Sequence, residues 1–364
     1  MPTRRQALAT LAAPAFLAAQ PPSDQVRAAI VGVGGRGSAD LKSIVGAPNV
    51  KLIAVCDIDP DARDRGATIG KDHKPELLED WRKLVERNDL DAVIIATPVD
   101  LHAEMASAAL DAGLSVYLEK PMGVDEQDVK TVMDAASRAK GVLQLGFQLR
   151  YDPVRRAAID LIHQGGIGEI AYMQGNRHGG DLPRDKDWIF DASRSGNIIV
   201  EQAVHILDLM NWATKTHPLR AMGSGGINVY KNVPPGRTIY DNYAVIYEYP
   251  DDVRLTFTHI YIDPSGFTGI QERIWGSEGA VDLPSGTFYE LTERGEERVP
   301  PRKLFEGDRG NMNQLAMNAF FEHVRARTEP LNNALYGKYA TLAAIMGRKA
   351  IDEKRFVTWD EVDL

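Results

Sequence analysis

Hydrophobic positions in the first part of the chain follow two alternating periods. Short apolar runs, typical of strands buried on both faces, alternate with segments whose apolar residues recur at helical spacing. The apolar runs cover residues 26–31, 51–56, 91–96, 115–118 and 142–146. This alternation predicts an α/β fold with a doubly wound parallel sheet over residues 24–148.

The second half changes to strict alternation of apolar and polar residues. Segments 241–249 and 253–258 flank a Pro-Asp-Asp turn and predict a hairpin. Further strands are expected at 170–177, 221–230, 271–275 and 280–283, and closing helices at 312–327 and 339–353. Residues 149–364 are therefore expected to form an α+β domain with an open, mostly antiparallel sheet covered by helices on one face.

The first twenty residues follow neither pattern. Arg4 and Arg5 precede thirteen weakly apolar residues, a run too short to span a hydrocarbon core of about 30 Å as a helix. The layout is that of a signal peptide, and the arginine pair resembles a twin-arginine export signal with cleavage near Ala19. We therefore expect residues 1–19 to be removed, no membrane insertion afterwards, and a periplasmic protein. The alternative is an alanine-rich leader on a cytoplasmic enzyme.

Composition narrows the classes of partner. The chain carries 42 basic and 51 acidic residues, a formal charge of −9, with no long basic run. Nucleic acid is therefore not expected as a partner, because its binding needs a clustered basic face. The single cysteine, Cys56, excludes an internal disulfide and a thiolate metal cluster, and we expect it to be buried.

A glycine-rich turn follows the first predicted strand. Gly32, Gly34 and Gly37 form a G-x-G-x-x-G motif, with Gly35 and Arg36 between them, before a helical segment. Such glycines permit a tight turn, close approach of a pyrophosphate and close helix packing, while helix N–H groups face the phosphates. This placement predicts a dinucleotide site.

A carboxylate ends the second predicted strand. Asp57 lies twenty residues beyond Gly37, the spacing at which an acidic residue binds the adenosine ribose. Its negative charge disfavours a 2′-phosphate, and the adjacent Ile58 is not basic, so NAD is expected rather than NADP, unless Arg63 or Arg65 reaches the site. The alternative role for Asp57 is to cap the following turn.

Two more polar segments stand at strand ends, where ligands of open α/β sheets bind. Thr97 and Pro98 follow one strand and His102 follows in the next helix, where it either approaches the nicotinamide ribose or caps its helix. Glu119 and Lys120 follow another strand, before a proline. Beside the predicted cofactor site, Glu119 and Lys120 are expected to contribute to binding, and the lysine to be functional rather than a solvated surface group.

These motifs, together with Ala112-Gly113 and the segments 147–153, 166–170 and 275–279, resemble the Gfo/Idh/MocA oxidoreductases, NAD(P)-dependent enzymes that act mostly on sugars and inositols. The resemblance covers essentially all of the chain after the leader. It implies that Lys120 contacts the reacting hydroxyl and that an Asp-x-x-x-His pair supplies the proton acceptor. His205 matches that histidine, and Glu201 replaces the aspartate. The resemblance also implies a homodimer or homotetramer through the open face of the second sheet.

The residue types support the same chemistry. Spacing of four places Glu201 and His205 on one face of a helix, with Asp208 near the same side. Oxidising an alcohol needs a base of near-neutral pKa at the hydroxyl, and a lysine ammonium stabilises the developing alkoxide. The alternatives are a surface ion pair or a core histidine. No metal is expected, because no second histidine stands at ligand spacing and Lys120 opposes a cation.

Several polar residues are candidates for binding the substrate. Their segments are expected to rim the cleft, and a tryptophan face stacks well on a sugar ring. These candidates are Arg150, Arg177, His178 and Trp188, together with Glu201 and His205.

The expected function is hydride transfer between a carbohydrate C–OH group and a tightly bound NAD. Tight binding follows from export, because no pool recycles free NADH outside the cytoplasm. The alternative is an NAD-dependent glycosidase that oxidises its substrate transiently, eliminates the aglycone and returns the hydride. A third reading is a sensor without turnover, which the presence of both Lys120 and His205 disfavours.

Overall fold

A computed structural model describes residues 25–182, 186–264, 267 and 269–364. The leader predicted at 1–19 lies outside the described residues. Within the described part of the chain, no helix combines the length and the apolar composition needed to cross a bilayer.

The first sheet consists of six parallel strands in the order β3-β2-β1-β4-β5-β6. The strands are β1 Val26–Val31, β2 Val50–Cys56, β3 Glu76–Leu78, β4 Ala92–Ile95, β5 Ser115–Leu118 and β6 Leu143–Leu145. The four residues of β4 and of β5 are all buried, because helices cover both faces. This arrangement confirms the predicted parallel fold class.

Cys56 ends β2 with 1% of its surface exposed, as expected for a core residue. Burial and the neighbouring Asp57 raise the pKa of its thiol to about 12, so the group stays protonated at neutral pH.

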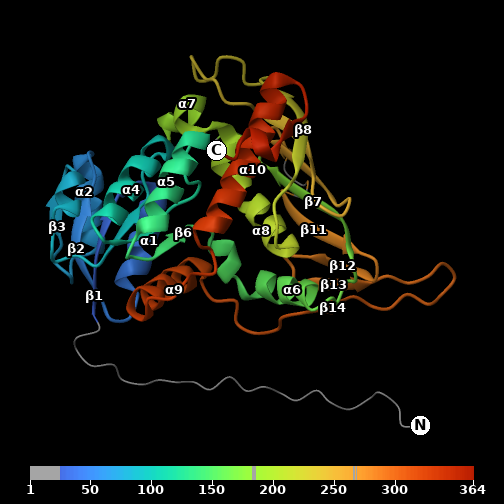
Figure 1. The fold of residues 1–364 in the computed structure, drawn as a ribbon, viewed down its shortest axis with the longest axis horizontal. Helices are drawn as coiled ribbons and strands as arrows, with labels where there is room; N and C mark the ends of the chain where they lie inside the picture. Colours follow the sequence, from blue (N-terminus) through green and yellow to red (C-terminus); the bar gives the residue numbers. More distant parts are fainter. Residues whose placement is uncertain (1–24, 183–185, 265–266, 268) are drawn as a thin grey trace, which may run out of the picture.

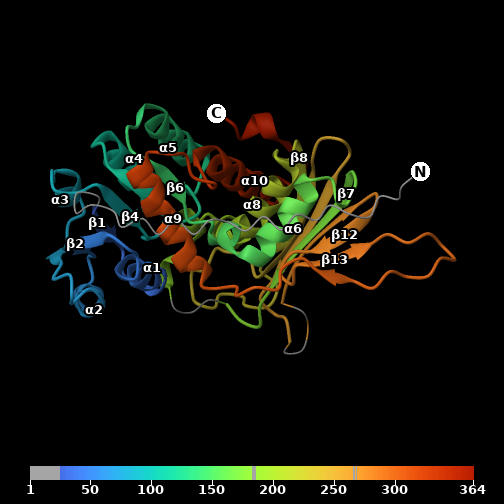
Figure 2. The same ribbon diagram turned by 90° about the horizontal axis from the view of Figure 1, so that it is seen from below.

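The helices of the first sheet include one from far along the chain. The local helices are α1 Gly35–Val45, α2 Pro60–Ile69, α3 Arg82–Val85, α4 His102–Asp111 and α5 Glu126–Arg138, with a 3₁₀ turn η2 at Val99–Leu101. Helix α9, Met312–Ala326, lies beside α1 and packs Phe320 and Phe321 into the core that holds Ile30 and Leu41 (Figure 2). The domain boundary between residues 148 and 149 stays a prediction. Helix α9 comes from the second predicted domain in sequence but packs on α1 of the first.

The second sheet has nine strands in the order β14-β13-β12-β11-β7-β10-β9-β8-β15. The strands are β7 Ile170–His178, β8 Arg220–Gly226, β9 Asn242–Glu248, β10 Arg254–Ile260, β11 Ile270–Gly276, β12 Gly279–Asp282, β13 Thr287–Glu290, β14 Arg302–Lys303 and β15 Val357–Thr358. Only the β7–β10 pair is parallel among the strand pairs of this sheet in the described chain, so the predicted mostly antiparallel sheet is confirmed.

Helices separate the two sheets. The remaining elements are η3 Gln148–Tyr151, α6 Pro153–His163, η4 Asp187–Phe190, α7 Ala192–Ser195, the π-helix η5 Ile199–Ala203, α8 Val204–Thr214, α10 Ala334–Glu353 and η6 Trp359–Glu361. Helix α10 packs on α5 of the first sheet and on α8 of the second (Figure 1). The two layers are thereby joined through a shared apolar core.

Two element boundaries differ from the sequence prediction by more than two residues. Strand β8 ends at Gly226 instead of residue 230, because the buried Asp241 carboxylate accepts hydrogen bonds from the N–H groups of Asn228, Val229 and Tyr230. These donors are then lost to a strand ladder. Helix α10 begins at residue 334, where the Asn333 side chain caps it, instead of at 339.

Candidate active site

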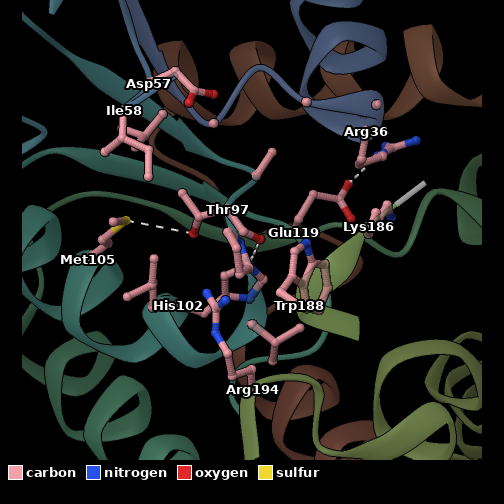
Figure 3. Close-up of a pocket in the computed structure, with 18 of the residues that line it drawn as sticks. Arg36, Asp57, Ile58, Thr97, His102, Met105, Glu119, Lys186, Trp188 and Arg194 are labelled. Carbon is pink, nitrogen blue, oxygen red and sulfur yellow. Dashed lines mark hydrogen bonds and ion pairs between the residues drawn. The ribbon is translucent and has the colours of Figure 1, made fainter. Parts of the chain in front are cut away.

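A cavity of about 550 Å³ lies at the carboxyl ends of the strands of the first sheet. This volume is in the range of small-molecule sites, and the position is where ligands of doubly wound sheets bind. Residues of the second domain close the other side, among them Lys186, Trp188 and Arg194 (Figure 3). The cavity therefore brings the predicted cofactor residues to face residues of the second domain.

The glycine turn has the geometry of a phosphate-binding loop. Gly32 has φ +84°, and a Cβ there would lie 2.6 Å from the Ala96 carbonyl oxygen. A Cβ on Gly37 would lie 1.9 Å from the Gly32 carbonyl oxygen, so this glycine permits close packing of α1 on the loop. A Cβ on Gly34 would meet nothing within 4 Å, and Gly34 and Gly35 line the cavity. The loop leaves room for a pyrophosphate at the start of α1, so these residues fit a dinucleotide.

Asp57 lines this cavity, and two backbone N–H groups hold its carboxylate. Its Oδ2 accepts from the Val33 N–H at 2.7 Å, and its Oδ1 accepts from the Asp59 N–H at 2.9 Å. Asp59, not Asp57, caps α2 by accepting from the Asp61 N–H. Ile58, 81% exposed, lines the cavity beside Asp57. The carboxylate is thus fixed in orientation and keeps lone pairs for ribose hydroxyls.

Arg36 and Glu119 connect the glycine loop with the Glu-Lys-Pro segment. Arg36 Nε donates to Glu119 Oε1 at 2.8 Å, and its Nη2 pairs with Asp40 Oδ1 at 2.8 Å. Arg36 Nη1 also donates to Asn313 at the start of α9, at 3.0 Å. Because the guanidinium is engaged on three sides, it fixes the wall of the cavity (Figure 3).

His102 joins the two turns that follow β4 and β5. The imidazole is buried, with Nδ1 2.7 Å from the Pro121 carbonyl oxygen and Nε2 3.1 Å from the Thr97 carbonyl oxygen. Burial lowers the pKa of His102, which favours a neutral ring that donates to one of these oxygens. The side chain lines the cavity, and its contacts place the backbone around Lys120 and Thr97.

Lys120 reaches across to the second domain. Its Nζ donates to the Glu201 backbone oxygen at 2.5 Å and lies 3.1 Å from Glu201 Oε1. Burial raises the pKa of Glu201, but Lys120 and Lys186 lower it below its ordinary value, so the carboxylate is ionised. Glu201 lies in a π-helix, a form common at functional sites. The helix expected over this segment is a π-helix at Glu201, and Glu201 and His205 line the same cavity.

His205 lies in the first turn of α8 and lines the same cavity as Lys120 and Glu201. Its Nδ1 is buried and finds no hydrogen-bond partner within the described residues. Burial, and then Lys120 and Arg177, hold the pKa of His205 well below its usual range, so the ring is neutral at pH 7. An ammonium donor and a neutral imidazole thus meet at one end of the cavity, an arrangement suited to moving a hydroxyl proton.

Arg150 does not rim the cleft, contrary to the sequence prediction. Its side chain is 0% exposed and forms two hydrogen bonds with the Asp208 carboxylate, both 2.8 Å long. The guanidinium also lies over the Tyr336 ring. Asp208 accordingly points into the core rather than toward the face that carries Glu201 and His205. This buried pair is structural.

His178 also does not line the cleft, contrary to the sequence prediction. Its Nε2 contacts the Thr258 hydroxyl at 3.0 Å, and neither of the two cavities around Lys120 includes it. Arg177, one residue earlier on β7, does line the cavity beside Lys120. Successive side chains of a strand point to opposite faces, so only one of the two can face the helices.

Trp188 lies where it was predicted, lining the large cavity. Sequence reasoning missed three groups at the adjoining cavity, namely Lys186, Gln202 and the Arg155–Glu272 pair. Lys186 stands two residues before Trp188, with its Nζ 5.7 Å from the ring centroid. The position of Lys186 two residues before Trp188 in the sequence was the signal that could have identified it as a site residue. The others depend on contacts between distant segments.

Comparison with known proteins agrees with this architecture. Residues 26–147 match the Gfo/Idh/MocA oxidoreductase family with an NAD-binding Rossmann fold, and residues 155–282 match the Gfo/Idh/MocA C-terminal domain. An inositol 2-dehydrogenase of Rhizobium meliloti is 27% identical over 258 residues, covering 70% of this chain and 74% of that protein.

Two further proteins are similar in part or in fold. A glycosyl hydrolase family 109 protein of Stenotrophomonas maltophilia is 35% identical over 159 residues, 41% of this chain and 35% of that protein. A levoglucosan dehydrogenase in complex with NADH shares the fold, with a TM-score of 0.80, 18% identity, and coverage of 92% of this chain and 99% of that one. Because the two family matches span the core of both sheets, the chain belongs to the Gfo/Idh/MocA family of NAD-binding oxidoreductases.

Proposed function

We propose that this protein is an NAD-dependent dehydrogenase of sugars or related polyols. The observation that carries the proposal is the meeting of Lys120, Glu201 and His205 where the dinucleotide cleft joins a second cavity. Similarity to an inositol 2-dehydrogenase supports the substrate class. Bound NAD supplies the hydride acceptor.

The proton is handled by two groups of this chain. Two of the three N–H donors of the Lys120 ammonium bind Glu201. The third is left to donate to the substrate hydroxyl oxygen. Neutral His205 would accept the hydroxyl proton of the substrate, and bound NAD would take up the hydride of the same carbon. Glu201 holds Lys120 in place through their ion pair. The carbon loses two electrons and becomes a carbonyl, and His205 releases the proton to water.

The test of this proposal is NADH formation by the purified full chain with NAD and a panel of inositols, aldoses and their derivatives. We expect NADH to accumulate with at least one member of the panel. A protein that binds NAD but yields neither NADH nor a modified sugar with any member would contradict the proposal.

A glycosidase is the second candidate, favoured by the similarity to a family 109 glycosyl hydrolase over 159 residues. In this reaction the substrate carbon is oxidised, the adjacent acidified C–H loses its proton, the aglycone leaves, water adds and the hydride returns. Aryl glycosides distinguish the two functions. Aglycone release without net NADH selects the glycosidase, and NADH accumulation selects the dehydrogenase.

We propose further that residues 1–19 direct export to the periplasm by the twin-arginine route. Support comes from Arg4-Arg5 and the short apolar run that follows. Cell fractionation and N-terminal sequencing of the mature protein test this proposal. An intact Met1 on active protein in the cytoplasm would contradict it.

We also propose a homodimer or homotetramer formed through the open face of the second sheet. Tyr172, Met222 and Ile246 are exposed on that face, which supports an interface there. Light scattering of the wild-type protein and of Ile246→Lys tests the assembly. A monomeric wild-type protein at micromolar concentration would contradict it.

A further inference from the structure

A second cavity of about 330 Å³ adjoins the cofactor cleft and shares Lys120, Glu201 and His205 with it. It is the space left for the substrate beside the proton-transfer groups. Its charged lining residues are four cations and two carboxylates, namely Lys120, Arg155, Arg177, Lys186, Glu201 and Glu272. The lining of this cavity therefore has a net excess of two positive charges.

Both carboxylates already have cationic partners. Glu272 accepts two hydrogen bonds from Arg155, at 2.7 and 3.1 Å, and Arg155 also donates to Asp152. Glu201 pairs with Lys120. The unbalanced charges are consequently those of Arg177 and Lys186.

Arg177 has no carboxylate partner in the described part of the chain. Its Nε donates to the Gln202 side chain at 3.0 Å, which leaves the two terminal nitrogens without a protein acceptor among the described residues. The residues opposite it on the flanking strands are His259 on β10 and Ile270 on β11. An imidazole and an aliphatic side chain carry no negative charge, so neither neighbour offsets the charge of Arg177.

Lys186 lies at the boundary of the two cavities. Its ammonium is 5.7 Å from the centroid of the Trp188 ring, and no described carboxylate pairs with it. Figure 3 shows Lys186 and Trp188 on the side of the cleft opposite Asp57 and Ile58. The lysine is therefore available to a bound substrate.

We propose that the substrate is a sugar or polyol that carries an anionic substituent, a carboxylate or a phosphate, bound by the terminal nitrogens of Arg177 with Lys186 beside it. A guanidinium offers paired donors that match either oxyanion. This proposal rests on the proposed dehydrogenase function. A bound carboxylate would offset one of the two excess positive charges of the cavity lining, and a phosphate would offset up to two.

The first measurement compares kcat/KM, on the full chain with NAD, for substrates that differ in one charged substituent, such as glucose, glucuronate and glucose 6-phosphate. We expect an anionic member to exceed its neutral counterpart by about 10- to 100-fold, the effect of a charged hydrogen-bonding group. The carboxylate and phosphate arms identify which oxyanion is preferred. Equal values for charged and neutral members would overturn the proposal.

The second measurement assigns the preference to Arg177. Arg177→Gln is expected to reduce kcat/KM for the anionic substrate by about 10-fold or more beyond its effect on the neutral one. Arg177→Lys should restore part of the preference. Arg138→Gln removes the same charge from the exposed end of helix α5 and should leave the ratio unchanged. An Arg177→Gln variant with an unaltered ratio would contradict the assignment.

A binding experiment separates failure of this proposal from failure of the proposed function. Calorimetry measures the affinity of NADH-loaded protein for glucuronate, glucose 6-phosphate and glucose without turnover. Preferential binding of an anion with no oxidation of any sugar supports the anion site and contradicts the dehydrogenase. Oxidation of neutral sugars without preferential anion binding supports the dehydrogenase and contradicts the anion site.

Discussion

Lys120 and Glu201 form an ion pair that joins the two domains at the candidate active site. Lys120 Nζ lies 3.1 Å from Glu201 Oε1, and the two side chains are 11% and 8% exposed. One residue follows strand β5 of the cofactor domain, and the other lies in the π-helix before α8. The group that faces the substrate hydroxyl is therefore positioned by both domains at once.

Replacing Lys120 by methionine keeps most of the side-chain length and removes the ammonium. We expect kcat to fall by about 10²-fold or more, because the donor to the developing alkoxide is lost. Lys130→Met is the matched control, since Lys130 pairs with Asp134 on the exposed face of α5. Initial rates of NADH formation measure both variants. Equal rates for Lys120→Met and the control would show that Lys120 has no part in the reaction.

The pH profile tests the state of His205. Its pKa lies well below the ordinary value of 6.5 because of burial and the charges of Lys120 and Arg177. The imidazole therefore stays neutral as the pH falls through 6.5, and the acid limb of kcat/KM should lie below that pH. Arg177→Gln removes a charge that lowers this pKa, so the limb should move to higher pH. An acid limb at or above 6.5 in the wild-type protein contradicts this assignment.

His205→Asn keeps a polar side chain but no base. We expect a loss of about 10²-fold or more in kcat, as for a positioned general base. The loss should persist across the pH range in which the wild-type protein is active. A variant that retains nearly full activity would exclude His205 as the proton acceptor.

Asp57 and Asp59 are two carboxylates at one turn with different contacts. Asp57→Ala should raise the KM for NAD by about 10-fold or more and narrow the preference for NAD over NADP, because a charged acceptor at the ribose is lost. Asp59→Ala removes only the cap of α2, at a cost of about 1 kcal/mol in stability. Steady-state kinetics with both dinucleotides provide the comparison. Equal KM changes in the two variants would argue against a role for Asp57 in binding.

The buried pair of Arg150 and Asp208 predicts a stability effect. Arg150→Met leaves the Asp208 carboxylate unpaired in the core and should lower the free energy of unfolding by about 3–5 kcal/mol. The double variant Arg150→Met/Asp208→Leu removes both charges and should recover much of that loss. Denaturant unfolding of the three proteins measures this. A double variant as unstable as the single one would show that packing, and not the unpaired charge, dominates.

Much of the cofactor half was predictable because its signals are local. The glycine turn between β1 and α1, and Asp57 at the end of β2, lie within one short stretch of chain whose periodicity identifies the elements. The parallel order of the first sheet then follows from the alternation of strands and helices. The docking of α9 on α1 was not predictable, since it joins segments far apart in sequence.

The substrate half was predicted less well for identifiable reasons. Arg177 and His178 point to opposite faces of strand β7, and only one of them can face the cleft. A shift of one residue in the strand register would exchange the two, so the sequence alone does not decide between them. Arg150 was misplaced because its partner, Asp208, lies 58 residues away. The π-helix around Glu201 results from a change in hydrogen bonding that has no signature in residue type.

The most direct test of the central claim is to follow deuterium from the substrate carbon. The full chain is incubated with NAD and a sugar deuterated at all its carbinol carbons, chosen from the panel members that it turns over. Mass spectrometry then measures the label on the dinucleotide, both free and recovered from the protein. We expect one deuterium on the nicotinamide ring of the reduced dinucleotide, accumulating about 10²-fold or more slowly in Lys120→Met. A dinucleotide that remains unlabelled while the sugar is converted would contradict the proposed dehydrogenase.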